Sequence, residues 1–187
     1  DALGELARPD VGAARDAAAA VDRLNELLFA RERFRGNEHD YYDPRNSFLN
    51  DVLERRRGIP ITLALVYVEV ARRAGLEAHG VGFPGHYLAK VGGEGGIVVD
   101  AFHGRVLSRA DCAGRLRGAL GPGAVLADEH LAASGPRQTL QRMLTNLKQI
   151  YLQRRQLEAA LACSDRLLLL APDAPHELRD RGLLHHA

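Results

Sequence analysis

A histidine and an aspartate, His86 and Asp100, are the residues of this chain whose types and spacing point most directly to chemistry. They lie in two short apolar runs, GFPGHYLAKV and GGIVVD, with a glycine-rich turn at residues 92–96. Two such runs and such a turn predict a β-hairpin, and a hairpin that folds near Glu94 brings residue 86 close to residues 100–102. We therefore predict an imidazole oriented by a carboxylate, which are two of the three members of a nucleophilic triad.

The pair is compatible with two roles. In a structural role, it forms a hydrogen bond that joins two strands and satisfies polar groups in a cleft, a common fate of buried polar side chains. In a functional role, His86 is a general acid or base that Asp100 orients, and it transfers protons without a covalent intermediate. His103 follows Asp100 by three residues and can reach the same cleft.

A buried helix is predicted shortly before the hairpin. Pro60 suits the first turn of this helix, because the amide hydrogen that proline lacks has no partner there. Apolar residues between 61 and 74 cover most faces of the helix, which indicates a position in the middle of a domain, and Gly75 ends it. A strand at residues 76–81, the hairpin and a further helix at residues 110–120 follow.

The residues before the buried helix carry helical and loop patterns. Residues 10–35 have apolar side chains at helical spacing and predict one or two helices. Gly, Asn and Asp-Pro then predict a loop at residues 36–44. We expect Asn46 or Ser47 to cap a short helix that continues through Arg57 and ends at Gly58.

The C-terminal part is predicted to be entirely helical. Residues 137–154 and 156–171 form two helical patterns with almost no linker, and residues 177–187 begin another. The spacing of Tyr151, Ala160 and Pro172 resembles one tetratricopeptide repeat, in which small residues let paired helices approach closely. Because one repeat cannot bury its own apolar face, we expect it to pack on the preceding region or on sequence outside this chain.

Composition narrows the classes of function. The 187 residues carry 25 basic and 24 acidic side chains, so the net charge of +1 provides no strong field for nucleic acid or an anionic membrane. No apolar run approaches the roughly 20 residues that span a bilayer. Cys112 and Cys163 are unclustered, and the histidines lack ligand spacing, so we predict neither disulfide, metal nor cofactor. The opening residues lack a signal-peptide pattern, and we expect a cytoplasmic protein.

Several motifs together resemble the bacterial SirB-one family. They are NDVLERRRGIPITL, FPGHYL and VVDAFHG, followed by the tetratricopeptide-like tail that includes RDRGLL. The resemblance covers essentially the whole chain, and the motifs are too long to arise by chance. That family joins a transglutaminase-like core of the second type to helical repeats.

The resemblance implies a core in which a catalytic cysteine starts the buried helix and histidine and aspartate lie on neighbouring strands. His86 and Asp100 match that histidine and aspartate, whereas the position of the cysteine falls near Pro60. No thiol is present at residues 55–65, so the usual acyl transfer through cysteine is expected to be lost. Thr62 is the nearby hydroxyl, and capping of the first helical turn explains it better than nucleophilic catalysis.

Further polar residues are candidates for the cleft. Asn46, Asn50 and Arg57 precede the buried helix, where an arginine fork would suit a carboxylate. Tyr87 is a candidate for the rim of the cleft, as His103 is. Turn hydrogen bonds, a solvated arginine face and core packing explain these residues nearly as well.

We therefore predict an α+β fold with a transglutaminase- or papain-like core, a buried helix on a small antiparallel sheet, at residues 43–135. A helical segment at residues 1–42 precedes it, and tetratricopeptide-like helices at residues 136–187 follow it. The favoured function is a catalytically degenerate member that binds a protein or peptide through the former catalytic cleft and the repeat surface. The alternative is a hydrolase, lyase or cyclase of a biosynthetic pathway, in which His86 is the acid or base and water or a small-molecule substrate replaces the thiol.

Overall fold

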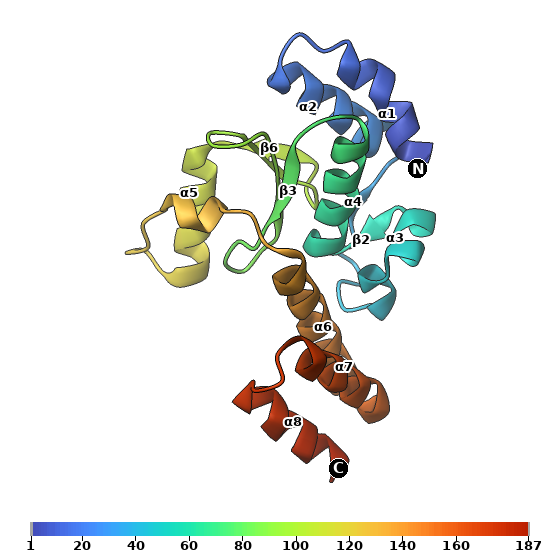
Figure 1. Cartoon of the computed structure of the whole chain (residues 1–187), viewed down its shortest axis with the longest axis vertical. Coiled ribbons are helices and arrows are strands. Elements are labelled where there is room, and N and C mark those ends of the chain that lie inside the picture. Colours follow the sequence, from blue (N-terminus) through green and yellow to red (C-terminus); the bar gives the residue numbers. More distant parts are fainter. Residues whose placement is uncertain (1, 187) are drawn as a thin grey trace.

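A computed structural model describes residues 2–186, and an α-helix, α4 (Pro60–Arg73), lies at the centre of its core (Figure 1). Ten of its fourteen residues are buried, as the apolar pattern on most faces predicted. Pro60 occupies its first turn, and the chain leaves the helix through Gly75, which has a positive φ of 94°. The predicted buried helix is confirmed.

A four-stranded antiparallel sheet packs against α4, in the order β3 (Ala78–Val81), β4 (Leu88–Val91), β5 (Ile97–Asp100) and β6 (Arg105–Leu107). The predicted hairpin pairs β4 with β5. Alternate residues face opposite sides of a strand, so Val99 belongs to the cluster with α4 whereas Val98 belongs to a second cluster. The second cluster is covered by α5 (Arg109–Leu120), which contributes Cys112 and Leu116.

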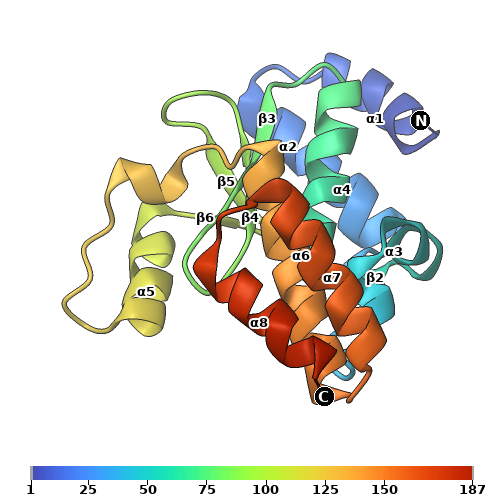
Figure 2. The ribbon, with the colours of Figure 1, turned by 60° about the horizontal axis from the view of Figure 1, so that its bottom comes forward.

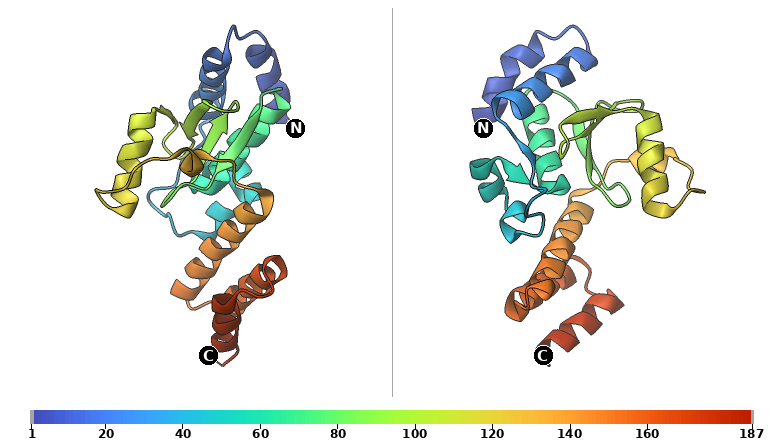
Figure 3. Two further views of the ribbon diagram at one scale, coloured as in Figure 1. Left: turned by 60° about the vertical axis from the view of Figure 1, so that its left-hand side comes forward. Right: turned by 180° about the vertical axis from the view of Figure 1, so that it is seen from behind.

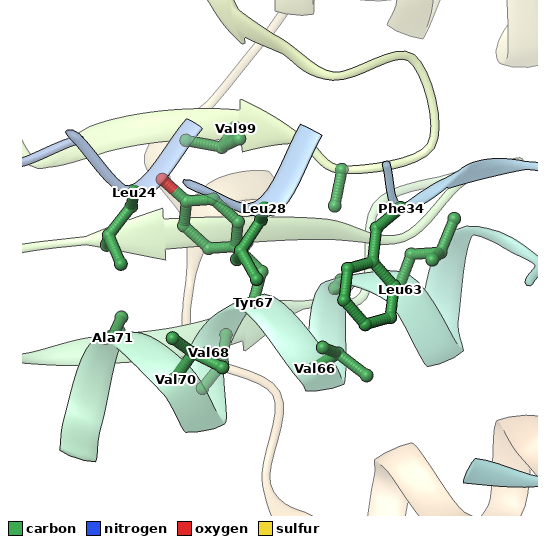
Figure 4. Close-up of a cluster of buried hydrophobic side chains, with 14 of the residues drawn as sticks. Leu24, Leu28, Phe34, Leu63, Val66, Tyr67, Val68, Val70, Ala71 and Val99 are labelled. Atoms are coloured by element: carbon green, nitrogen blue, oxygen red, sulfur yellow. The ribbon is translucent and has the colours of Figure 1, made fainter. Parts of the chain in front are cut away.

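Helices at the N-terminus complete the main core. They are α1 (Ala2–Gly12), α2 (Ala17–Asn25) and a π-helical turn at Glu26–Arg31. Asp16 caps α2 by accepting a hydrogen bond from the amide of Ala19 at 2.8 Å. Figure 4 shows Leu24 and Leu28 around the ring of Tyr67 of α4, near Val99 of the sheet. The N-terminal helices therefore share one hydrophobic core with α4 and the sheet.

The segment that leads into α4 differs from the prediction. A 3₁₀ turn at Pro44–Ser47 precedes α3 (Leu49–Arg55), which ends because Arg56 adopts a left-handed conformation with φ 56°. Then β2 (Arg57–Gly58) pairs in parallel with β1 (Arg35–Gly36). The expectation that Asn46 or Ser47 caps a helix through Arg57 is wrong. The side chain of Asp43 caps the 3₁₀ turn, and Phe48, in an extended conformation, precedes α3. Asn46 does not cap a helix because its side chain donates a hydrogen bond to the carbonyl of Asp40.

The C-terminal helices form an arm that extends from the core in Figure 1 and lies in front of the core in the turned view of Figure 2. After a 3₁₀ turn at Asp128–Leu131, α6 (Pro136–Gln153) pairs with α7 (Leu157–Leu170), and α8 (Pro175–His185) packs against α7. The predicted helical pair is confirmed. The arm is joined to the core at the start of α6, where the hydroxyls of Thr139 and Tyr87 are 2.7 Å apart.

The views in Figure 3 agree that the sheet lies between α4 on one face and α5 on the other. The fold is thus α+β, as predicted. No helix within residues 2–186 has both the length and the apolar sequence that a membrane span requires.

Candidate functional site

The carboxylate of Asp100 is the centre of a buried polar network at the end of β5. Its Oδ1 lies 2.9 Å from Nε2 of His86 and also accepts hydrogen bonds from the amides of Phe102 and His103 at 3.2 and 3.3 Å. Its Oδ2 lies 2.7 Å from Nδ1 of His103 and accepts a hydrogen bond from Arg115 at 2.7 Å. The predicted proximity of His86 to Asp100 is therefore present, and a second imidazole shares the same carboxylate.

The charge of Asp100 is stabilised by these partners although the side chain is completely buried. Burial by itself would raise the pKa of Asp100. The hydrogen bonds and the electrostatic attraction of His86 and then His103 outweigh that effect, so the pKa of Asp100 is well below its ordinary value. The carboxylate therefore stays ionised and can hold both imidazoles in fixed orientations.

A tight turn positions His86 just before β4. The amide of His86 donates to the carbonyl of Phe83 at 3.0 Å, and Gly85 adopts a positive φ of 68°. His86 thus lies in the turn that enters the strand and not on the strand itself, whereas Asp100 is the last residue of β5. The hairpin register pairs Ala89 with Val99 and so brings the turn before β4 beside the end of β5.

His86 lines a small pocket, which we call the His86 pocket, of about 250 Å³ between the core and the helical arm. The core contributes Tyr41, Pro60 and Ile61, and α6 contributes Arg142 and Asn146. His86 is only 8 % exposed, and its Nδ1 has no hydrogen-bond partner within residues 2–186. The imidazole therefore presents one nitrogen for a ligand while the other is bound to Asp100.

The other polar groups of the His86 pocket suit hydrogen bonding to a ligand. Burial raises the pKa of Tyr41, so its hydroxyl stays protonated. Arg142 donates to the carbonyl of Phe83 at 3.0 Å and lies over the ring of Tyr87 at 5.6 Å. Burial lowers the pKa of Arg142, but a guanidinium remains charged in proteins. The pocket therefore combines a cation, a phenol, an amide and an imidazole.

Thr62 is not available as a nucleophile in this arrangement. Its Oγ1 accepts from the amide of Ile59 at 3.2 Å and donates to the carbonyl of Asn46 at 2.7 Å, and the residue is completely buried. It therefore caps the first turn of α4. The two cysteines lie elsewhere, Cys112 on α5 beyond the sheet and Cys163 on α7, and burial raises the pKa of both thiols.

The predicted binding residues are divided among different places. Asn46 is buried and pins the preceding loop by donating to the carbonyls of Asp40 and Tyr41 at 2.7 and 3.2 Å. The side chain of Tyr87 lines the His86 pocket but is buried, and Asn50 is exposed at the start of α3. Predicted binding roles for these residues stay predictions.

Arg57 and His103 do not line the His86 pocket. Both line a larger cavity of about 540 Å³, formed by the β1–β2 pair and the residues that follow β5. The sequence places Arg57 near the buried helix, but only the parallel pairing with β1 determines which cavity its side chain lines.

Three important residues of the site were not predicted as site residues. Arg115 comes from α5 on the other face of the sheet, and Arg142 and Asn146 come from the helical arm. Sequence spacing gives no signal for Arg115, because its contact with Asp100 depends on how α5 packs. The helical pattern around Asn146 was visible, but its proximity to His86 requires knowing how the arm meets the core.

A metal ion has three potential ligands here, since ligand atoms of His86, Asp100 and His103 all lie within 4.8 Å of one another. Both imidazoles, however, are hydrogen-bonded to the carboxylate, and the guanidinium of Arg115 lies 2.7 Å from Oδ2. A bound cation would have to separate these contacts and repel Arg115. The arrangement therefore favours a hydrogen-bonded network.

Comparison with known proteins agrees with this geometry. Residues 1–145 match the family described as the transglutaminase-like superfamily. The chain belongs to this family. Residues 147–187 match the tetratricopeptide repeat, so the transglutaminase-like part is followed by repeat helices, and the predicted resemblance is confirmed. No solved structure matches.

The transglutaminase-like chain has similar relatives in bacteria and in mammals. A UPF0162 protein of Xylella fastidiosa strain 9a5c is 45 % identical over 168 residues, which are 87 % of this chain and 59 % of the relative. A UPF0162 protein of Vibrio cholerae is 32 % identical over 91 % of this chain and 64 % of its own length. The F-box only protein 21 of Mus musculus is 34 % identical over 68 % of this chain and 21 % of its own length. The chain thus spans about three fifths of the length of the Xylella relative.

Proposed function

We propose that this transglutaminase-like chain is a cytosolic module that binds a protein or peptide and lacks the catalytic thiol of its fold. The observation that carries the proposal is the composition of the His86 pocket. Pro60, at the start of α4, faces this pocket from the core, and Arg142 and Asn146 face it from α6, the helix that leads into the repeat. Neither Thr62 nor the cysteines can supply a nucleophile there, because all three are buried in other contacts.

The size of the pocket favours one side chain of a larger ligand. Its volume of about 250 Å³ is below the ~300–1,000 Å³ of pockets that enclose whole small molecules. The pocket also lies at the junction of the core and the arm, where a partner can contact both. Peptide binding at a pocket of this kind gains specificity from the enclosed side chain, while the repeat helices offer additional surface.

A peptide-library screen tests this proposal. We expect peptides selected by the wild-type chain to lose at least ~10-fold in affinity for Tyr41→Ala and Asn146→Ala, because each removes a hydrogen-bonding group from the pocket. Val125→Ala is the matched control, since Val125 is 81 % exposed in the loop after α5. Selection of no peptides, or equal binding by all three variants, contradicts the proposal.

The second candidate is an enzyme that uses His86 as general acid or base. The observation in its favour is that Nε2 of His86 is held by Asp100 at 2.9 Å while the ring lines a pocket. Such a base acts on a proton within hydrogen-bond reach, with water or substrate in the place of a thiol. Its substrate would be the bound peptide or a small molecule.

Mass spectrometry of selected peptides separates the two functions. If the chain is an enzyme, the peptides are cleaved or modified by the wild type and stay intact with His86→Ala, while the melting temperature of the variant changes little. If the chain only binds, the wild type leaves them intact. A melting temperature that falls strongly in His86→Ala, with no turnover by the wild type, identifies the pair as structural.

A further inference from the structure

A second cavity lies next to the Asp100 network and shares no lining residue with the His86 pocket. We call it the His103 cavity, because His103 lines it in the way that His86 lines the first pocket. Its volume of about 540 Å³ is in the range of small-molecule sites. The two cavities are linked through Asp100, whose two oxygens contact one imidazole each.

Two unpaired cations face the His103 cavity. Arg35 and Arg57 are direct neighbours in the parallel β1–β2 pair, so their side chains leave the backbone on the same side. Within residues 2–186, neither guanidinium has an ion pair or a hydrogen bond. The two arginines that precede Arg57 in the sequence do have partners: Arg55 is paired with Asp43 at 3.1 Å, and Arg56 is paired with Glu32 at 2.9 Å.

Placing two like charges at adjacent positions is unfavourable, and an anion bound between them would remove that repulsion. Guanidinium groups bind carboxylates and phosphates by paired hydrogen bonds, which suits a pair of neighbouring arginines. The cavity wall holds one acidic side chain, Glu38, which is exposed. An anionic ligand would therefore meet a net positive surface.

Aromatic side chains form part of the remaining wall, beside Asn37, His39 and two glycines. Phe29, Phe34 and Phe102 line the cavity, and Phe34 and Phe102 are almost completely buried. The ring of His103 lies 5.0 Å from that of Phe102 in an edge-on arrangement. His103 uses Nδ1 for Asp100, and its side chain is 38 % exposed, which leaves Nε2 for a ligand. An aromatic body would pack on these rings while its charged group reaches the arginines.

We propose that the His103 cavity binds a small organic anion, an aromatic or similarly flat apolar body that carries a carboxylate or phosphate group. Arg35 and Arg57 bind the anionic group, and the phenylalanine rings enclose the body. His103 contacts the ligand, and its hydrogen bond to Asp100 connects the occupied His103 cavity to the Asp100 network. The evidence for this site does not depend on peptide binding in the His86 pocket.

Binding of benzoate and phenyl phosphate, measured by calorimetry and by the ring resonances of His103, tests the proposal. Benzyl alcohol is the neutral comparison. We expect at least one anion to bind and to shift the His103 resonances, and benzyl alcohol to bind at least ~10-fold more weakly, the loss expected for one charge-assisted hydrogen bond. The better of the two anions distinguishes a carboxylate from a phosphate ligand.

Charge-removing variants locate the site. Arg57→Gln and Arg35→Gln are expected to weaken anion binding at least ~10-fold each without lowering stability, because neither guanidinium has a protein partner to lose. Arg166→Gln is the matched control, with the same change of charge at an exposed position on α7. Asn146→Ala, which lies in the His86 pocket, should leave anion binding unchanged and so separates the two proposals.

Three results would overturn the inference. They are failure of both anions to bind at millimolar concentration, equal binding of benzyl alcohol, and equal weakening by Arg166→Gln. A marked loss of stability in Arg57→Gln would also contradict it, because that result assigns the guanidinium a structural role. Loss of peptide binding in the Asn146→Ala variant has no bearing on these outcomes.

Discussion

Pro60→Cys is expected to introduce a reactive thiol next to His86 in the transglutaminase-like site. Pro60 begins α4 and lines the same pocket as His86. A thiol at this position would lie at a helix N-terminus, where the backbone amides favour an anion, and beside an imidazole that Asp100 orients. Pro60 is buried, which disfavours a thiolate, but the helix N-terminus and the imidazole should outweigh that effect, as the partners of Asp100 do for its carboxylate, so the pKa of the introduced thiol should fall.

The expected gain in reactivity can be estimated. At about pH 6, a thiol with an ordinary pKa of about 8.5 is ~0.3 % thiolate, whereas a thiol whose pKa has fallen to about 6.5 is ~24 % thiolate, a gain of roughly 75-fold. A weaker base is also a weaker nucleophile, and a Brønsted slope of about 0.45 reduces the gain by roughly 8-fold. The introduced thiol should therefore react about tenfold faster than an ordinary one.

Alkylation by iodoacetamide at about pH 6, followed by mass spectrometry, measures this rate. The native background is expected to be slow, because Cys112 and Cys163 are buried and burial raises the pKa of both thiols. Pro136→Cys is the helix-start control, since Pro136 is also the first residue of a helix but is exposed and does not line the His86 pocket, so any advantage of Pro60→Cys over it is not due to easier access. Equal rates for Pro60→Cys, Pro136→Cys and the double variant Pro60→Cys/His86→Ala would refute the reasoning.

Two further predictions concern buried charges. Asp100→Asn should lower the free energy of unfolding by about 3 kcal/mol and the melting temperature by roughly 6–12 °C, because Arg115 and two imidazoles lose their shared anion. Lys148→Met should also lower the free energy of unfolding by about 3 kcal/mol, because Glu177, which Lys148 contacts at 2.7 Å, is left buried without its cation and keeps the hydrogen bond from Ser164 at 3.2 Å. Lys148→Met/Glu177→Leu should recover most of that loss. Urea unfolding near pH 7 measures all three values.

The pH dependence of the free energy of unfolding supplies a control for both the Asp100 and the Lys148 predictions. The pKa of Asp100 is lowered by folding, so its contribution is present above the ordinary value of 3.8 and is lost as the pH falls through the folded value. Burial opposes the charge of Lys148, but Glu177 and Asp180 outweigh that effect and raise the pKa of Lys148. The contribution of Lys148 to stability is therefore present below the ordinary pKa of 10.5 and is lost as the pH rises through the pKa of the folded state. Outside the pH range in which the charged group contributes, each variant should have nearly the same free energy of unfolding as the wild type.

Asp128→Asn provides a surface comparison, since that side chain is 86 % exposed and its ion pair with Arg109 should contribute less than ~1 kcal/mol. A loss in Asp100→Asn no larger than this would show that the Asp100 network contributes little to stability. For Lys148, an equal loss in the single and double variants would show that the Glu177 carboxylate left without its cation is not the cause.

Much of the site could be predicted because its main signals are local in sequence. The glycine-rich turn and the flanking apolar runs predicted the hairpin, and the hairpin predicted that His86 meets Asp100. The capping role of Thr62 follows from its place three residues after Ile59, at the start of a helix. Each of these inferences depends on backbone geometry over a few residues or on one tight turn.

Other roles were assigned incorrectly or not at all because they depend on packing between distant segments. Asn46 has the residue type of a helix cap, but the structure uses its side chain to hold the loop that carries Tyr41. Arg57 was grouped with the cleft of His86, whereas pairing with β1 places it in the other cavity. Polar side chains of this kind can hydrogen-bond in several local conformations, and tertiary contacts select one.

The sequence by itself determined the buried helix, the hairpin that follows it, the meeting of His86 with Asp100, the C-terminal helical pair and the absence of a thiol near Pro60. These features depend on hydrophobic period, turn residues and residue identity, all of which are local. Only the tertiary structure decided that Arg115 completes the set of groups bound to Asp100, that α6 forms one wall of the His86 pocket, and that a second, positively charged cavity lies on the other side of Asp100. The physical reason is that side chains far apart in sequence meet where buried apolar faces pack, and the packing of those faces is fixed only by the whole fold.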